Sequence, residues 1–145
     1  MTALRVAVDD LIAARQQWTV LRSRAADGSP LVAEADLPLH CARWPRFDQH
    51  VAVVLAYAGF DGGRPCRSTL EQLEDFSDRL VLAAGRDGAL VAFTTGANRQ
   101  VLHFYVDSAT TVGQRLIDEA PGWPGGARVL THLDPSMAQV AEMTF

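Results

Sequence analysis

The sequence predicts an α+β fold with a ferredoxin-like βαββαβ core, and three observations support this class. One segment is apolar on both alternating sets of residues, as in a central strand. Two segments repeat apolar residues at three- and four-residue steps, as in amphipathic helices. Two further strands flank a glycine turn, which indicates a hairpin. The strands are predicted at residues 50–58, 89–95, 100–106 and 128–133, and the helices at 68–84 and 109–120.

An N-terminal segment at about residues 4–37 precedes this core. Val8, Leu11 and Ile12 share one face of a predicted short helix. Two strands at about 18–25 and 31–37 then flank Asp27-Gly28-Ser29-Pro30, whose glycine and proline are typical of a turn. This hairpin is expected either to extend the sheet or to fold over its open face.

The central strand and its following helix have the clearest pattern. Ser68 and Glu71 have the spacing of a capping box and predict the helix start at Ser68. Gly85 suits the positive φ that ends a helix. One buried stripe is expected along this helix, formed by Leu70, Leu73, Phe76, Ser77, Leu80 and Ala84.

The later elements complete the order strand, helix, strand, strand, helix, strand. Ser108 or Thr110 can cap the second helix. Right-handed crossovers place the first and last core strands side by side or nearly so, with both helices on one face. No linker divides the chain, so residues 1–145 are predicted to form a single domain with its core at about 49–134.

Composition is typical of a soluble globule, with 48% hydrophobic and 21% charged residues in 145. The formal charge of −4 gives no reason to expect nucleic acid. No segment has the about 18 apolar residues that span a membrane, and the N-terminus lacks a secretory signal, so we expect a cytoplasmic protein. Cys41 and Cys66 are expected to be reduced thiols there, with a disulfide as the alternative in an oxidising compartment.

The chain contains several short motifs in a fixed order: Trp18, Asp27-Gly28-Ser29-Pro30, Gly63, Pro65, Leu73-Glu74-Asp75, Arg99, Phe104-Tyr105 and Asp134-Pro135. Taken in this order, they resemble an uncharacterised bacterial family catalogued as domain of unknown function 695. Behind the last of them, this chain has Ser136 and Met137 where such members tend to have a Trp.

That family is similar in architecture to regulator of ribonuclease activity B, an inhibitory protein with a ferredoxin-like fold. The resemblance therefore implies a bacterial protein with this fold and a regulatory role. It implies no catalytic residues, because the family has no established activity.

The residues themselves offer one candidate ligand-binding face, formed by His103, Tyr105, His132 and Tyr57. Histidine can act as a general base, and aromatic rings on the central strands can stack bases as in RNA-binding sheets. The alternative is that His103 is a half-buried structural residue and that the N-terminal segment covers the rings. No metal site, cofactor or catalytic set is predicted, since no residues stand at a recognised ligand or nucleophile spacing.

A contact surface for another protein is the leading prediction. Trp and Arg are enriched at interface hot spots, and both occur in the irregular segment at residues 40–47, while Trp123 lies in a second loop. The sequence therefore favours a non-catalytic, regulatory interaction module over an enzyme or small-ligand binder. A homodimer through a free strand edge is a further expectation. Glu74 or Asp75 is expected to form an ion pair with Arg99. The predicted interface residues are Arg43, Trp44, Arg46 and Trp123.

Overall fold

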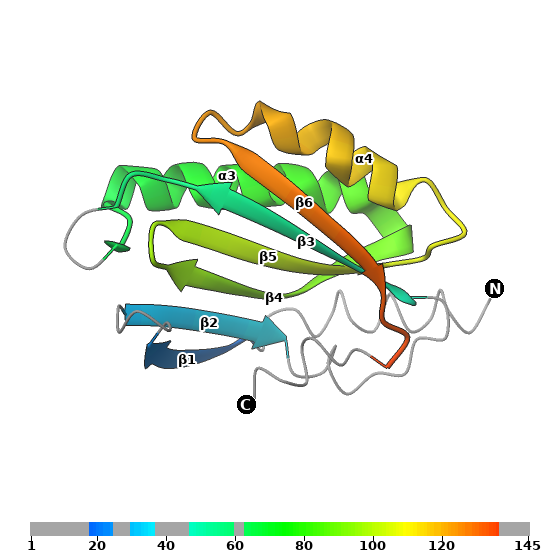
Figure 1. Cartoon of the computed structure of the whole chain (residues 1–145), viewed down its shortest axis with the longest axis horizontal. Helices are drawn as coiled ribbons and strands as arrows, with labels where there is room; N and C mark the ends of the chain where they lie inside the picture. The colour runs from blue at the N-terminus through cyan, green and yellow to red at the C-terminus, as the bar shows by residue number, and fades with distance from the viewer. Residues whose placement is uncertain (1–17, 25–29, 37–46, 60–62, 137–145) are drawn as a thin grey trace.

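The computed structural model describes residues 18–24, 30–36, 47–59 and 63–136. They form one antiparallel sheet with two α-helices, so the predicted α+β class is confirmed (Figure 1). The strand order is β1-β2-β4-β5-β3-β6. The elements are β1 (Trp18–Arg24), β2 (Pro30–Asp36), β3 (Gln49–Ala56), α3 (Arg67–Ala84), β4 (Gly88–Gly96), β5 (Arg99–Val106), α4 (Val112–Glu119) and β6 (Ala127–Leu133).

The N-terminal hairpin extends the sheet. β1 pairs with β2, and β2 pairs with β4, each in antiparallel register. Of the two expected positions for this hairpin, the edge beside β4 is therefore the one observed (Figure 1). The predicted short helix that contains Val8, Leu11 and Ile12 lies outside the described residues, as do residues 40–46 of the predicted irregular segment and residues 137–145.

Strand β3 lies between β5 and β6, as its apolar character on both alternating sets predicted. Val51, Val53 and Leu55 are fully buried on one face, and His50 and Ala52 are buried on the other. β3 pairs with β5 along its full length and with β6 from Gln49 to Leu55. The first and last strands of the predicted core are thus side by side.

Helix α3 begins one residue earlier than predicted. Cys66 occupies the N-cap position, and no side chain makes a capping hydrogen bond, so the predicted capping box of Ser68 and Glu71 is wrong. Glu71 instead forms an ion pair with Arg67 at 3.6 Å. The helix ends at Gly85 with φ 60°, as predicted, and the Gly85 amide donates to the Val81 carbonyl.

Helix α4 begins later than the predicted residue 109. The Asp107 carboxylate accepts a hydrogen bond from the Ala109 amide at 2.9 Å, and the Asp107 carbonyl accepts one from the Thr110 amide. These bonds hold a turn, so the helix starts only at Val112, whose amide donates to Thr110 Oγ1. A 3₁₀ turn at Ala120–Gly122 follows.

Helices α3 and α4 contribute to one hydrophobic core on the same face of the sheet, which we call the covered face. In α3, Leu73, Phe76 and Leu80 are buried, whereas Leu70 is exposed, which shortens the predicted buried stripe. We call the other side of the sheet the opposite face. The side chains that alternate away from the core on β3, β5 and β6 point there.

Candidate functional site

The strand register brings together polar side chains from three strands on the opposite face. On β3, His50 lies directly opposite Tyr105 of β5 on one side and His132 of β6 on the other. His103 is two residues before Tyr105, so it shares this face. Asp134 follows the end of β6 and hydrogen-bonds to Tyr105. We call His50, His103, Tyr105, His132 and Asp134 the histidine cluster.

His50 is the centre of the cluster. Its Nε2 atom lies 2.8 Å from Nδ1 of His103, in a side-chain hydrogen bond. The ring centroids of His50 and His103 are 5.1 Å apart and stacked, and the His132 ring lies edge-on at 4.7 Å from His50. The Tyr105 ring is tilted at 5.2 Å from the His50 ring. Three aromatic residues therefore contact one imidazole.

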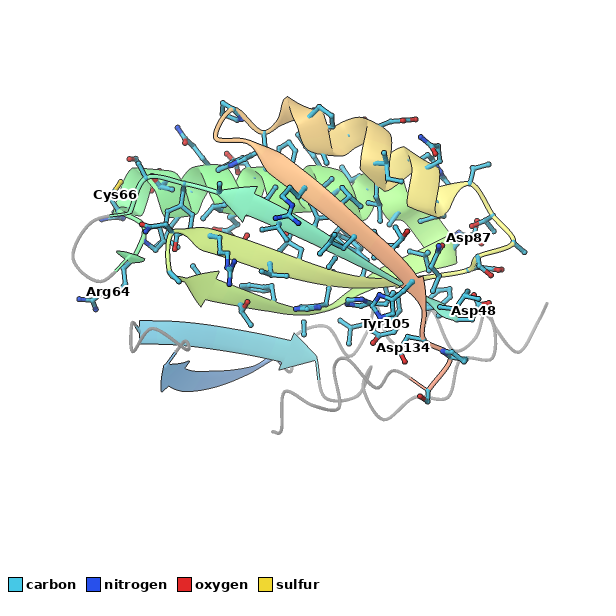
Figure 2. All side chains as sticks on the ribbon, viewed as in Figure 1. Asp48, Arg64, Cys66, Asp87, Tyr105 and Asp134 are labelled. Carbon is cyan, nitrogen blue, oxygen red and sulfur yellow. The ribbon has the colours of Figure 1, made fainter. Side chains whose placement is uncertain are left out.

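A buried hydrogen bond connects β5 to the end of β6. The Tyr105 hydroxyl donates to Asp134 Oδ2 at 2.7 Å, and Tyr105 is 0% exposed. Figure 2 shows these two labelled side chains near the end of the sheet. A short bond to a carboxylate is among the stronger side-chain hydrogen bonds. The cluster thus fixes the position of β6 against the two central strands.

Burial controls the protonation of the two bonded histidines. It lowers the pKa of His50 to about 4, with a further lowering by His132 and an opposing effect of Asp134. Burial also lowers the pKa of His103 to about 4, and the neighbouring His50 acts in the same direction. Both imidazoles are therefore neutral at pH 7, and one donates to the other.

This neutral pair leaves one ring nitrogen unused. His50 Nδ1 is buried and has no hydrogen-bond partner among the described residues, and the His50 residue is only 3% exposed. A buried polar atom without a partner is costly unless a water or ligand satisfies it. Within residues 18–24, 30–36, 47–59 and 63–136, no group of three His, Cys, Asp or Glu could hold a metal ion.

Three of the four predicted ligand-face residues come together: His103, Tyr105 and His132. Tyr57 does not join them, because it alternates with the core residues of β3 and packs on the covered face. Its hydroxyl donates to the Gly63 carbonyl at 2.8 Å. His50 was missed as a site residue, although the pairing of the first and last core strands, which we predicted, places it beside His132.

The predicted interface residues have different outcomes. Arg43, Trp44 and Arg46 lie outside the described residues. Trp123 is 5% exposed and belongs to the hydrophobic core, so its prediction as a surface contact is wrong. The physical reason is that its indole Nε1 donates to the Ala56 carbonyl at 2.7 Å while its ring contacts Phe76.

The predicted ion pair between helix α3 and the hairpin is also absent from the described part of the chain. Glu74 and Asp75 are exposed on α3 and do not contact Arg99. Instead, Arg79 of α3 pairs with Glu119 of α4 at 3.3 Å, which connects the two helices. The pair is exposed, so it contributes little to stability.

The edge of β6 is a second site of interest. β6 is the last strand in the sheet order, and it pairs only with β3 among the described strands. Two large apolar side chains on it are exposed, Leu130 at 49% and Leu133 at 68%. An exposed edge with apolar side chains can pair with another strand.

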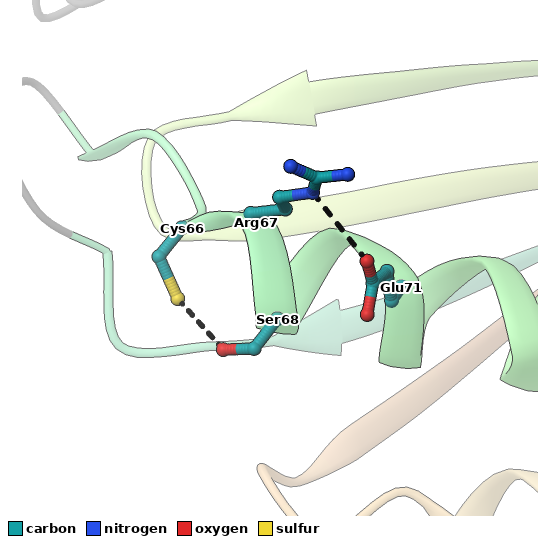
Figure 3. A network of polar contacts seen from close by, with 4 residues as sticks. All are labelled: Cys66, Arg67, Ser68 and Glu71. Atoms are coloured by element: carbon teal, nitrogen blue, oxygen red, sulfur yellow. Dashed lines mark hydrogen bonds and ion pairs between the residues drawn. The ribbon is translucent and has the colours of Figure 1, made fainter.

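A third feature is the thiol of Cys66 at the start of α3. Its Sγ atom lies 3.2 Å from the hydroxyl oxygens of both Ser68 and Thr69 (Figure 3 shows the Ser68 contact). The Ser68 hydroxyl, then the Thr69 hydroxyl and the nearby amides, lower the pKa of this thiol to about 7. Cys66 is exposed and is the one free cysteine among the described residues.

Comparisons of this chain with family models, with curated proteins and with solved structures found no match. No helix in the described part of the chain is both long and apolar enough to cross a membrane.

Proposed function

We propose that the protein is a non-catalytic interaction module that binds a protein strand along the edge of β6. The observation that carries this proposal is the combination of an edge backbone with exposed Leu130 and Leu133 on the same strand. Strand addition gives affinity through main-chain hydrogen bonds and specificity through alternate side chains. No catalytic reaction is needed to explain these features.

The backbone of β6 offers its hydrogen-bonding groups in a defined pattern. The Asp134 amide donates to the Asp48 carbonyl, and the Ala56 amide donates to the Gly126 carbonyl. In an antiparallel ladder, alternate residues point their N–H and C=O groups toward the same neighbour. Residues 128, 130 and 132 therefore bond to β3, whereas residues 127, 129, 131 and 133 direct both groups outward.

We infer further that the module is a cytoplasmic regulator with a ferredoxin-like core. The strand order around β3 and the two helices on one face support this assignment of the core. The resemblance to the family catalogued as domain of unknown function 695 supports a regulatory role. An inhibitor-type protein acts by contact, which agrees with a binding edge.

The test compares two substitutions of Thr131, an exposed residue whose N–H points outward. Thr131→Pro removes that donor without removing a hydrogen bond to β3, and Thr131→Val keeps it. Tagged wild-type and variant chains are recovered from the host, and the co-purifying proteins are quantified. We expect the wild type and Thr131→Val to retain the same partner, and Thr131→Pro to lose it with an intact thermal transition. Equal recovery by all three chains would refute the proposal.

The alternative function is small-ligand binding at the histidine cluster. The specific observation in its favour is the buried, unpartnered Nδ1 atom of His50. A ligand that binds the folded state raises the thermal midpoint. A panel of metabolites and metal ions should then give a shift that His103→Gln removes and Tyr57→Phe, on the covered face, leaves in place. No shift across the panel would exclude this alternative.

A further inference from the structure

The geometry of β6 points to a particular occupant of its edge. Ala127, Val129, Thr131 and Leu133 are the residues whose N–H and C=O groups point outward. These positions are symmetric about Leu130, and none of them is a proline. A strand of this kind can pair with an identical strand, because a two-fold axis at its centre gives every outward residue a partner.

We propose that a second copy of this chain binds there, with the two β6 strands paired antiparallel around Leu130. Val129 then faces Thr131 of the second copy, and Ala127 faces Leu133 of the second copy. Each of these pairs exchanges two main-chain hydrogen bonds. The two sheets join into one, and both β6 edges are covered.

The side chains on the opposite face fit this register. Leu130 meets Leu130 of the second copy at the axis, which buries apolar surface that is 49% exposed in the single chain. Arg128 faces His132 of the second copy on the same face of the joined sheet.

The neighbouring register is less favourable. An axis at Thr131 would place Leu130 opposite His132 and would leave Ala127 opposite Pro135, which has no N–H to donate. The axis at Leu130 uses every outward residue and places the exposed leucine against its own copy. The hydrogen bonds and the apolar contact thus favour the same pairing.

This inference rests on the proposed function, because it names the strand that the β6 edge binds. It adds one prediction: the purified chain alone forms a dimer in which residue 130 lies on the two-fold axis. Strand addition by an unspecified partner does not predict such a dimer. Across the new seam, residue 130 belongs to a pair whose Cα atoms are about 4.5 Å apart, which suits a disulfide.

The experiment uses the full chain with Cys41→Ser and Cys66→Ser, so that an added cysteine is the only thiol. Leu130→Cys should form a disulfide-linked dimer under mild oxidation. In His132→Cys, the two cysteines of the dimer lie several residues apart along the paired strands, so this variant should form at least about tenfold less disulfide-linked dimer. Sedimentation equilibrium of the unmodified chain should show a reversible dimer. Thr131→Pro should raise its dissociation constant about tenfold or more, and Thr131→Val should not.

A second variant distinguishes the loss of dimerisation from a loss of folding. Leu130→Glu lies on an exposed side chain and places two carboxylates together at the axis, so it should give a folded monomer. A monomeric wild type without Leu130→Cys cross-links would overturn this inference. In that case, the proposed function would still hold if another protein co-purified with the wild type and not with Thr131→Pro. If no such protein co-purified, the proposed function would fail together with the inference.

Discussion

The two faces of the sheet are buried by different chemistry. The covered face uses apolar side chains from β3, β5 and the helices, such as Val53, Leu102 and Leu80, all 0% exposed. The opposite face buries His50 and Tyr105 to nearly the same extent, although both carry polar groups. Apolar burial is stable at any pH, whereas polar burial depends on hydrogen bonds and protonation. The comparison predicts which changes each face tolerates.

The largest effect is expected from a truncation on the covered face. Phe104 is fully buried in the core, one residue from His103 but on the other side of β5. Phe104→Ala should lower the free energy of unfolding by about 3 to 5 kcal/mol, through lost burial and a cavity. Denaturant unfolding at pH 7 measures this loss. Val101→Ala, on the opposite face of the same strand and only partly buried, is the matched control and should cost clearly less.

Acidification should affect the opposite face more than the covered face. Since the pKa of His50 and His103 falls from 6.5 to about 4 on folding, the unfolded chain binds more protons between these values. The contribution of these two histidines to stability is therefore fully present above about pH 6.5 and is lost as the pH falls toward 4. For one histidine, lowering the pKa over this range corresponds to about 3 kcal/mol of unfolding free energy, at ~1.4 kcal/mol per pKa unit.

The measurement is the free energy of unfolding as a function of pH for the wild type and two variants. His103→Gln keeps a hydrogen-bonding side chain but cannot titrate, so its stability should depend less on pH between 4 and 6.5. His132→Gln, at an exposed position beside His50, should leave most of the dependence in place. If His103→Gln and the wild type had the same pH profile, the buried pair would not be the origin of the acid sensitivity.

Removing a hydroxyl from each face gives a smaller and more direct comparison. Tyr105→Phe removes a buried bond to the Asp134 carboxylate and should cost about 1.5 to 3 kcal/mol. Tyr57→Phe removes a bond to the neutral carbonyl of Gly63 and should cost about 1 kcal/mol. Thermal and denaturant unfolding of both variants measure the difference. Equal costs would show that the charged acceptor adds nothing on the opposite face.

The sequence predicted the strands and helices well because their signals are local. The alternation in β3 and the helical period in α3 fixed those elements to within two residues, and Gly85 ended α3 as expected. The start of α3 was wrong because a capping box needs two side-chain hydrogen bonds that the fold does not form. Local pattern identifies an element better than it identifies its cap.

The candidate site depended on information that no single segment contains. His103 and Tyr105 share a face by strand alternation, but His50 meets His132 only because β3 and β6 pair with Gln49 opposite Leu133. Trp123 was predicted as a contact residue because Trp is enriched at interface hot spots. Its indole turns inward because the Ala56 carbonyl accepts its N–H, and that contact comes from a strand far away in the sequence.

The smallest expected effect on stability concerns Cys66, which lies on neither face and serves as a reference for exposed polar groups. In a Cys41→Ser chain, Cys66 is the only thiol, and its reaction with iodoacetamide should follow a titration with a midpoint near pH 7. Ser68→Ala removes the first contributor to the lowered pKa and should move that midpoint upward. Ser77→Ala, at a partly buried position further along α3, is the matched control and should not.

The role of Arg67 distinguishes two explanations of this shift. Its guanidinium pairs with Glu71 and is not among the causes of the lowered pKa, so Arg67→Gln should leave the midpoint unchanged (Figure 3). A midpoint that rose in Arg67→Gln but not in Ser68→Ala would assign the effect to charge instead of hydrogen bonding. Because Cys66 is exposed, these substitutions should change the unfolding transition little below about pH 7. A pKa that is lowered in the folded chain links protonation to folding for both groups. The contribution of His50 to stability is lost as the pH falls from 6.5 toward about 4, whereas that of Cys66 is lost as the pH falls from 9.0 toward about 7.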